Sequence, residues 1–240
     1  MSLLPGQLFR LYTRDASTTV LAVLGWTTLF SIYAYGLKFL LMTKKLPMSE
    51  AAKGRGTSRE EFAKNVASCI VAITTHLYLG PTALMLSFRY QAGGYPAALS
   101  AFLQPAPPVE ALENDRLCCQ VGELFTGNIL YQVIFWLLRW ETGFDTLLHH
   151  IGFFVAGYLI LDLTVFGKLS AGAMSMEVSS VFLSLHLMFR QIDGKLCALV
   201  SEAAAAVFAL SFILVRIFWY GFIVIDFNYN FWMEPFKLTS

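Results

Sequence analysis

The chain has 240 residues, of which 57% are hydrophobic and only 14% are charged. A soluble globular domain carries about 25% charged residues, so this composition excludes a water-facing protein and predicts a multi-pass membrane protein. The formal net charge is +1 and no long basic tract occurs, so we expect no nucleic-acid partner.

Apolar runs long enough to be membrane-crossing helices recur along the chain. A helix needs about 20 apolar residues, within a range of about 17–25, to cross the hydrocarbon. Segments that meet this requirement lie at about residues 17–42, 62–88, 117–138, 144–166, 169–189 and 203–225. None alternates as the strands of a membrane barrel do. We therefore predict an all-α, polytopic bundle of about six transmembrane helices.

The predicted spans divide the chain into three parts. We expect residues 1–61 to form an N-terminal leader helix and a basic cytosolic loop, residues 62–226 to form the main helical domain, and residues 227–240 to form a short C-terminal tail. The first span has a longer uncharged run than a cleaved signal peptide, which predicts that it is retained. Lys and Arg are more frequent on the side of the 43–64 loop, which favours a cytosolic position for it and places both termini across the membrane.

Polar residues recur at helical spacing inside several spans. These stripes are Asn65, Cys69, Ala72 and His76; Asn128 and Gln132, with Tyr131 beside them; Glu177, Ser180 and Ser184; and Arg216 alone. They predict a bundle with a polar interior. The simplest interpretation of Asn128 and the serines is hydrogen bonding between helices, worth about 0.6 kcal/mol per bond. Arg216 is expected to pair with Glu177 or to contact a lipid phosphate.

Two adjacent histidines near the start of the fourth span, His149 and His150, follow Asp145 by about one helical turn. An ionisable residue at membrane depth costs about 2.5–3.5 kcal/mol on insertion scales, so it needs a partner, a wet cavity or a function. Histidine is the natural general base near neutral pH, and a nearby carboxylate orients it. A neutral imidazole is also an acyl acceptor. We therefore predict that His149 and His150 are catalytic and that Asp145 orients them.

Metal-binding signatures are missing from the sequence. The chain has four histidines, too few for the histidine boxes of membrane di-iron desaturases. Its four cysteines have no CxxC spacing, which indicates neither a zinc site nor a disulfide framework. A single metal held by the histidine pair with Glu177 has no spacing signature in its favour. We expect no bound metal or cofactor.

In their order along the chain, the polar elements resemble the motifs of TLC-domain membrane proteins, which include ceramide synthases and translocating-chain-associated membrane proteins. The matching elements are Asn65-Val-Ala-Ser68 with His76, Phe125-Thr-Gly127-Asn-Ile-Leu-Tyr131, His149-His150, Met176-Glu177-Val-Ser179-Ser180, and the run from Phe212 to Arg216. The resemblance covers about residues 62–225. It implies a central, lipid-accessible chamber into which His149 and His150 project.

Two departures separate the chain from ceramide synthases. Gln132 stands where the family usually has an aspartate, and an amide cannot act as a general base. The aspartate-rich stretch that follows the double histidine in ceramide synthases is also missing here. The chain is therefore closer to the small TLC-domain homologues, which are implicated in membrane-lipid composition.

The resemblance implies handling of a lipid or acyl chain in membrane-lipid homeostasis, in the endoplasmic reticulum or another endomembrane. A histidine-dependent acyltransferase would act on membrane lipids with acyl-CoA as co-substrate. The alternatives are a non-enzymatic lipid-binding, sensing or trafficking protein and a transporter, although no internal repeat favours the last. The residues expected to contact substrate are His76, Tyr131, Gln132, Glu177, Ser180 and Arg216.

Overall fold

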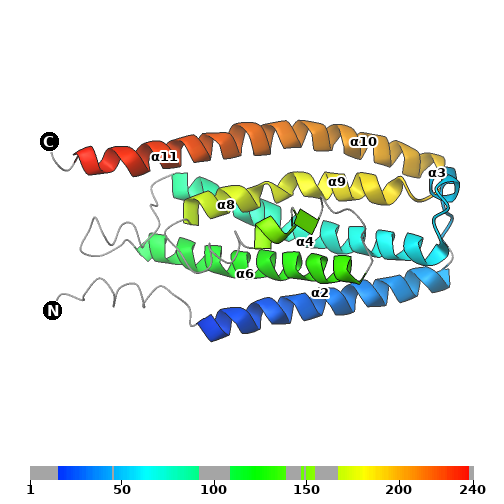
Figure 1. Ribbon diagram of the computed structural model, residues 1–240. Helices are drawn as coiled ribbons and strands as arrows, with labels where there is room; N and C mark the ends of the chain where they lie inside the picture. Colours follow the sequence, from blue (N-terminus) through cyan, green and yellow to red (C-terminus); the bar gives the residue numbers. More distant parts are fainter. Residues whose placement is uncertain are drawn as a thin grey trace.

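The computed structural model describes residues 16–44, 46–91, 109–138, 147–148, 150–154 and 167–237. These residues form a bundle of long helices (Figure 1). Within the described ranges the one β-type pairing is an isolated antiparallel bridge between Met48 and Ile192. The predicted all-α membrane fold is therefore confirmed, with four described segments long and apolar enough to cross a membrane: Ser17–Lys44, Arg59–Gln91, Gly167–Phe189 and Lys195–Tyr229.

The described helices differ in detail from the predicted spans. They are α2 (Ala16–Lys44), α3 (Glu50–Gly54), α4 (Arg59–Gln91), α6 (Val109–Leu137), α8 (Gly167–Ser175), α9 (Glu177–Phe189), α10 (Lys195–Ser211), the π-helical η2 (Phe212–Trp219) and α11 (Tyr220–Lys237). The predicted fifth span is divided at Met176 between α8 and α9. The sixth is part of a longer continuous helix made of α10, η2 and α11. Most of the predicted fourth span, 144–166, lies outside the described residues.

Helix α4 is the central element of the bundle. It packs against α2, α6, α8 and α9, whereas α10 packs mainly on α9 (Figure 1). Ala63, Ala67 and Ala83 of α4 are completely buried, and small residues let neighbouring membrane helices approach closely. The start of α2 and the end of α11 lie at the same end of the bundle (Figure 1).

Two glycines allow the closest helix contacts. A Cβ atom on Gly80 of α4 would lie 2.6 Å from the backbone nitrogen of Val178 in α9. A Cβ atom on Gly127 of α6 would lie 2.6 Å from the Cβ of Trp26 in α2, and the neighbouring Thr27 hydroxyl donates to the Gly127 carbonyl at 3.1 Å. These contacts hold α9 against the middle of α4 and α2 against α6.

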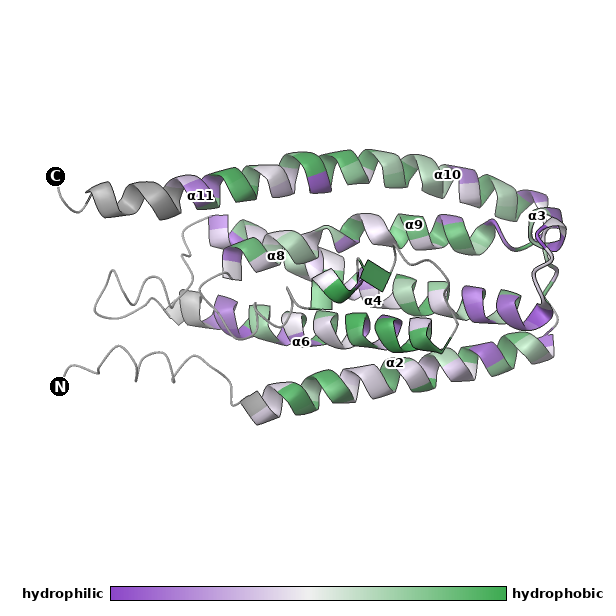
Figure 2. Ribbon diagram, viewed as in Figure 1, coloured by the Kyte–Doolittle hydropathy of each residue, from purple (hydrophilic) through white to green (hydrophobic). Residues whose placement is uncertain are grey.

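At one end of the bundle, the segment before α3 is hydrogen-bonded to the connection between α9 and α10. The Ser49 backbone nitrogen donates to the Gln191 carbonyl at 2.8 Å, and the Ser49 hydroxyl donates to the Arg190 carbonyl at 2.9 Å. The Asp193 nitrogen donates to the Pro47 carbonyl at 3.1 Å. Hydrophilic residues concentrate at this end, while hydrophobic residues cover much of α10 and η2 (Figure 2). This distribution fits a water-facing end and a lipid-facing side.

Buried polar contacts join the helices at the opposite end. The Tyr90 hydroxyl donates to the Asp115 carboxylate at 2.7 Å, linking α4 to α6. Lys168 of α8 pairs with Asp226 of α11, and the Lys168 side chain is almost completely buried. Buried charges are tolerated when they are paired in this way.

Substitution of Gly80 by alanine tests the α4–α9 contact. The added methyl group meets backbone atoms of Val178 that cannot rotate away, and overpacking of this kind costs about 1–3 kcal/mol. We expect a lower melting temperature for the purified protein in detergent. Gly36→Ala in α2 is the matched control because a Cβ there meets nothing within 4 Å, and it should melt no lower than wild type. Equal melting of the two variants would contradict the packing argument.

Candidate functional site

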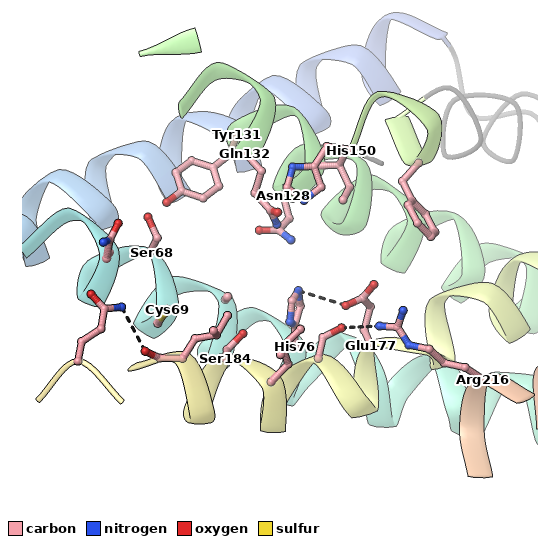
Figure 3. A pocket seen from close by; sticks show the side chains of 18 residues that line it. Ser68, Cys69, His76, Asn128, Tyr131, Gln132, His150, Glu177, Ser184 and Arg216 are labelled. Atoms are coloured by element: carbon pink, nitrogen blue, oxygen red, sulfur yellow. Dashed lines mark hydrogen bonds and ion pairs between the residues drawn. The ribbon is translucent and has the colours of Figure 1, made fainter. Parts of the chain in front are cut away.

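A cavity of about 680 Å³ lies between α4, α6 and α9. Its lining includes all the predicted substrate-contacting residues, namely His76, Tyr131, Gln132, Glu177, Ser180 and Arg216. It also includes His150, together with Asn65, Ser68, Asn128 and Gln191. Figure 3 shows the side chains of α6 and His150 facing those of α4 and α9 across the cavity.

The cavity extends along α4 from the loop end toward the middle of the helix. Asn65, Ser68 and His76 all line it, and Asn65 and His76 are about three turns, or about 16 Å, apart along the axis. Gln191, in the connection bound to Ser49, lines the cavity as well. The cavity is therefore lined by neutral polar groups near the loops and by ionisable groups farther in (Figure 3).

His76 and Glu177 form an ion-pair contact at the inner part of the cavity. The His76 Nε2 atom lies 3.4 Å from the Glu177 Oε2 atom, and both side chains are largely buried. Helix α9 begins at Glu177, where the positive end of the helix dipole favours a carboxylate. The backbone of Ser180 lies near the His76 ring, but the Nδ1 atom of His76 makes no hydrogen bond within the described structure. Glu177 thus orients the ring through Nε2, while the Nδ1 atom is buried.

Arg216 reaches the same region from the π-helical segment η2. Its Nε atom donates to the Ser179 hydroxyl and its Nη2 atom to the Ser180 hydroxyl, each at 2.9 Å. The guanidinium also lies over the Phe212 ring, 5.2 Å from its centroid. The expected partner Glu177 is instead in contact with His76. Short π-helical segments often occur at functional sites, and here one carries the cationic side chain of the cavity.

Asn128 and His150 lie on the opposite wall (Figure 3). Asn128 is only 1% exposed, and neither atom of its amide group has a hydrogen-bond partner among the described residues. The interpretation of Asn128 as an interhelical hydrogen-bonding residue was therefore wrong. Tyr131, one turn along, packs its ring against Phe30 and Phe135, with centroids at 6.0 Å and 4.3 Å. The aromatic contacts fix the register of α6 at the cavity.

The described structure covers only part of the predicted catalytic group. His150 lines the cavity, whereas Asp145 and His149 lie outside the described residues and stay predictions. His186 hydrogen-bonds to the Ser201 hydroxyl at 3.0 Å, between α9 and α10, and is not part of the lining. Among the described residues, no group of three or more His, Cys, Asp or Glu side chains is arranged to hold a metal ion.

Sequence reasoning did not include Ser179 or Asn128 among the substrate-contacting residues. Ser179 holds Arg216, and the only signal for it was its place in the Glu-Val-Ser-Ser motif. Asn128 lies on the same predicted face as Gln132, which indicated the cavity. The sequence could not indicate that its amide would lack a partner, because that depends on which side chains neighbouring helices bring near it.

One protein-family model matches residues 21–239, almost the whole chain, and is described as the TLC domain. No curated protein and no solved structure matches the chain. The match includes most of α2, which the sequence resemblance left outside, and every cavity-lining residue named above.

Substitution of Arg216 by lysine tests the link between η2 and α9. A lysine keeps the charge but cannot donate to two hydroxyls with the geometry of a guanidinium. Hydrogen bonds to charged groups contribute about 1.5–3 kcal/mol, so we expect a lower melting temperature in detergent. Arg190→Lys is the control because Arg190 is exposed at the end of α9. An unchanged melting temperature for Arg216→Lys would show that these two bonds do not hold the helices together.

Proposed function

The chain belongs to the TLC-domain family, and from this premise we propose that its cavity binds a membrane lipid and that an acyl group is transferred to this lipid with a histidine as the base. The observation that carries the proposal is the orientation of His76 by Glu177 beside the cavity. We place this activity in membrane-lipid homeostasis, in the endoplasmic reticulum or another endomembrane. Membrane lipids are the proposed partners and acyl-CoA the proposed co-substrate.

In the proposed reaction, His76 is the general base. Its imidazole, which lines the cavity, takes the proton from the hydroxyl or amino group of the acceptor lipid, whose oxygen or nitrogen then attacks the carbonyl carbon of the acyl thioester. The tetrahedral intermediate collapses with cleavage of the carbon–sulfur bond, and the departing thiolate takes up the proton from His76. The products are an acylated lipid and a free thiol. Glu177 stabilises the histidine while it carries the extra proton.

Arg216 supports this chemistry through its charge. Negative charge develops on the carbonyl oxygen as the acceptor attacks, and a fixed cation in a site of low dielectric constant stabilises it. The hydrogen bonds from Arg216 to Ser179 and Ser180 fix the guanidinium in place. His150, on the facing wall, is the second candidate base (Figure 3), and Asp145 and His149 keep their predicted catalytic roles.

The second candidate function is lipid binding without turnover. It is favoured by Gln132, because Glu177 is the only carboxylate among the described residues that line the cavity. In that case the same groups would hold a lipid for sensing or transfer between membranes. The cavity and its ligand would be the same, and only the chemical step would be missing.

Loss of the base should strongly lower transfer without loss of lipid binding. We expect His76→Asn to lower acyl transfer from a thioester donor by about 10²–10⁴-fold, the usual contribution of a general base, and Glu177→Gln to lower it less. Transfer is measured with the full chain reconstituted in lipid vesicles and a labelled acyl thioester.

His186→Asn is the control for this experiment because His186 lies outside the cavity lining. Transfer should be close to wild type in that variant. Undiminished transfer in His76→Asn would rule out His76 as the base. No transfer by wild type, together with bound lipid, would favour the second candidate function.

Removal of the adjacent histidines should change the lipid that accompanies the protein. We expect His149→Ala combined with His150→Ala to reduce an acyl lipid that co-purifies with wild type, since His150 lines the cavity. Lipid mass spectrometry of the two purified proteins provides the measurement. An identical lipid profile would argue against a role for the pair in binding or chemistry.

A further inference from the structure

The amide group of Asn128 is the least satisfied polar group of the cavity wall. The side chain is 1% exposed, and both Oδ1 and Nδ2 lack a hydrogen-bond partner among the described residues. A buried polar group left in this state costs about 1–3 kcal/mol. The group faces the cavity opposite His76 (Figure 3). A ligand that restores its hydrogen bonds would therefore gain binding energy that an apolar chain cannot.

The two amide atoms set the chemistry of such a ligand. Nδ2 is a donor and needs an acceptor, while Oδ1 is an acceptor and needs a donor. The facing groups are already engaged, since His76 Nε2 contacts Glu177 and Arg216 donates to Ser179 and Ser180. A plain ester offers acceptors only. A ligand complementary to Asn128 offers both an acceptor and a donor a few atoms apart.

We propose that Asn128 selects the lipid, by binding an acyl lipid that has an unesterified hydroxyl group next to its acyl carbonyl. The carbonyl accepts from Nδ2, and the hydroxyl donates to Oδ1. Monoacylglycerols and lysophospholipids have this arrangement, whereas fully esterified glycerolipids have no such hydroxyl. The assignment rests on the proposed function, because the lipid that Asn128 binds, with its free hydroxyl group, is the acceptor of the proposed acyl transfer.

Asn128 is better suited to selecting the lipid than to transferring a proton. An amide cannot exchange protons as a base, so it contributes by holding a group in place. It lies one turn from Gln132 and Tyr131, which also line the cavity, and the ring contacts of Tyr131 keep this wall rigid.

Three single-chain probes separate the two hydrogen bonds. 1-Oleoylglycerol has both the carbonyl and the hydroxyl, methyl oleate has only the carbonyl, and oleyl alcohol has only the hydroxyl. Binding to the full chain in detergent micelles is measured by competition against a fluorescent acyl probe. We expect wild type to bind 1-oleoylglycerol about tenfold more tightly than either of the others, as one extra hydrogen bond in a buried site predicts.

Asn128→Leu replaces both polar amide atoms by methyl groups and keeps the branching of the side chain. We expect its affinity for 1-oleoylglycerol to fall most, by at least about tenfold, and the three probes to bind with similar affinities, so that the preference disappears. Its melting temperature without added lipid should not fall, because an unsatisfied buried group is removed. If the leucine variant does not fold, the same binding measurements are made on Asn128→Ala. Thr126→Val is the control, since the buried Thr126 hydroxyl also lacks a partner among the described residues but does not line the cavity.

Three results would overturn the proposal: similar affinities of wild type for the three probes, a preference that survives removal of the amide, or no saturable binding of any probe. The proposed function is tested separately. A preference that depends on Asn128 in a protein without transfer activity would leave the selection intact and refute the acyl transfer. Transfer activity without a preference among the probes would support the acyl transfer and refute selection by Asn128.

Discussion

The cost of placing ionisable groups inside a membrane determines how this bundle is assembled. His76, Glu177 and Arg216 all lie on segments that qualify as membrane spans, where an uncompensated charge is expensive. Each reduces that cost through a group on another helix, because His76 contacts Glu177 and Arg216 donates to the serines of α9. These contacts require α4, α9 and η2 to meet at one level of the bundle.

The closest packing of α4 against α9 occurs at the same level of the bundle as the contact between His76 and Glu177. Gly80 lies one turn beyond His76 on α4, and its missing side chain allows contact with the backbone of Val178, which follows Glu177. Gly80 and His76 therefore lie on the same face of α4. The close contact at Gly80 brings Glu177 of α9 near His76. The break at Met176 makes Glu177 the first residue of α9, so that the helix end and the ion-pair contact coincide.

Composition and periodicity were sufficient to predict the helical class and the residues that face the interior. Length and hydropathy indicate a span, and spacing indicates a face, because both depend only on local sequence. The pairing of side chains between helices was not predictable in this way. The carboxylate expected near the histidines was Asp145 on the same helix, yet the one in contact with a histidine is Glu177 on another helix, with His76. Neither the break at Met176 nor the π-helical turns have a proline or glycine that would mark them in the sequence.

The π-helical segment has an evolutionary consequence. Most of its surface is exposed and apolar, since Ile213, Leu214, Ile217 and Phe218 are all at least 44% exposed, and only Arg216 projects from it to the cavity. Exchanges among apolar residues at the exposed positions would be nearly neutral. Gain or loss of one residue between Ser211 and Arg216 would rotate the guanidinium by about a quarter of a turn relative to α10 and remove it from Ser179 and Ser180. Selection on this segment should therefore conserve its length more strictly than the identity of its residues.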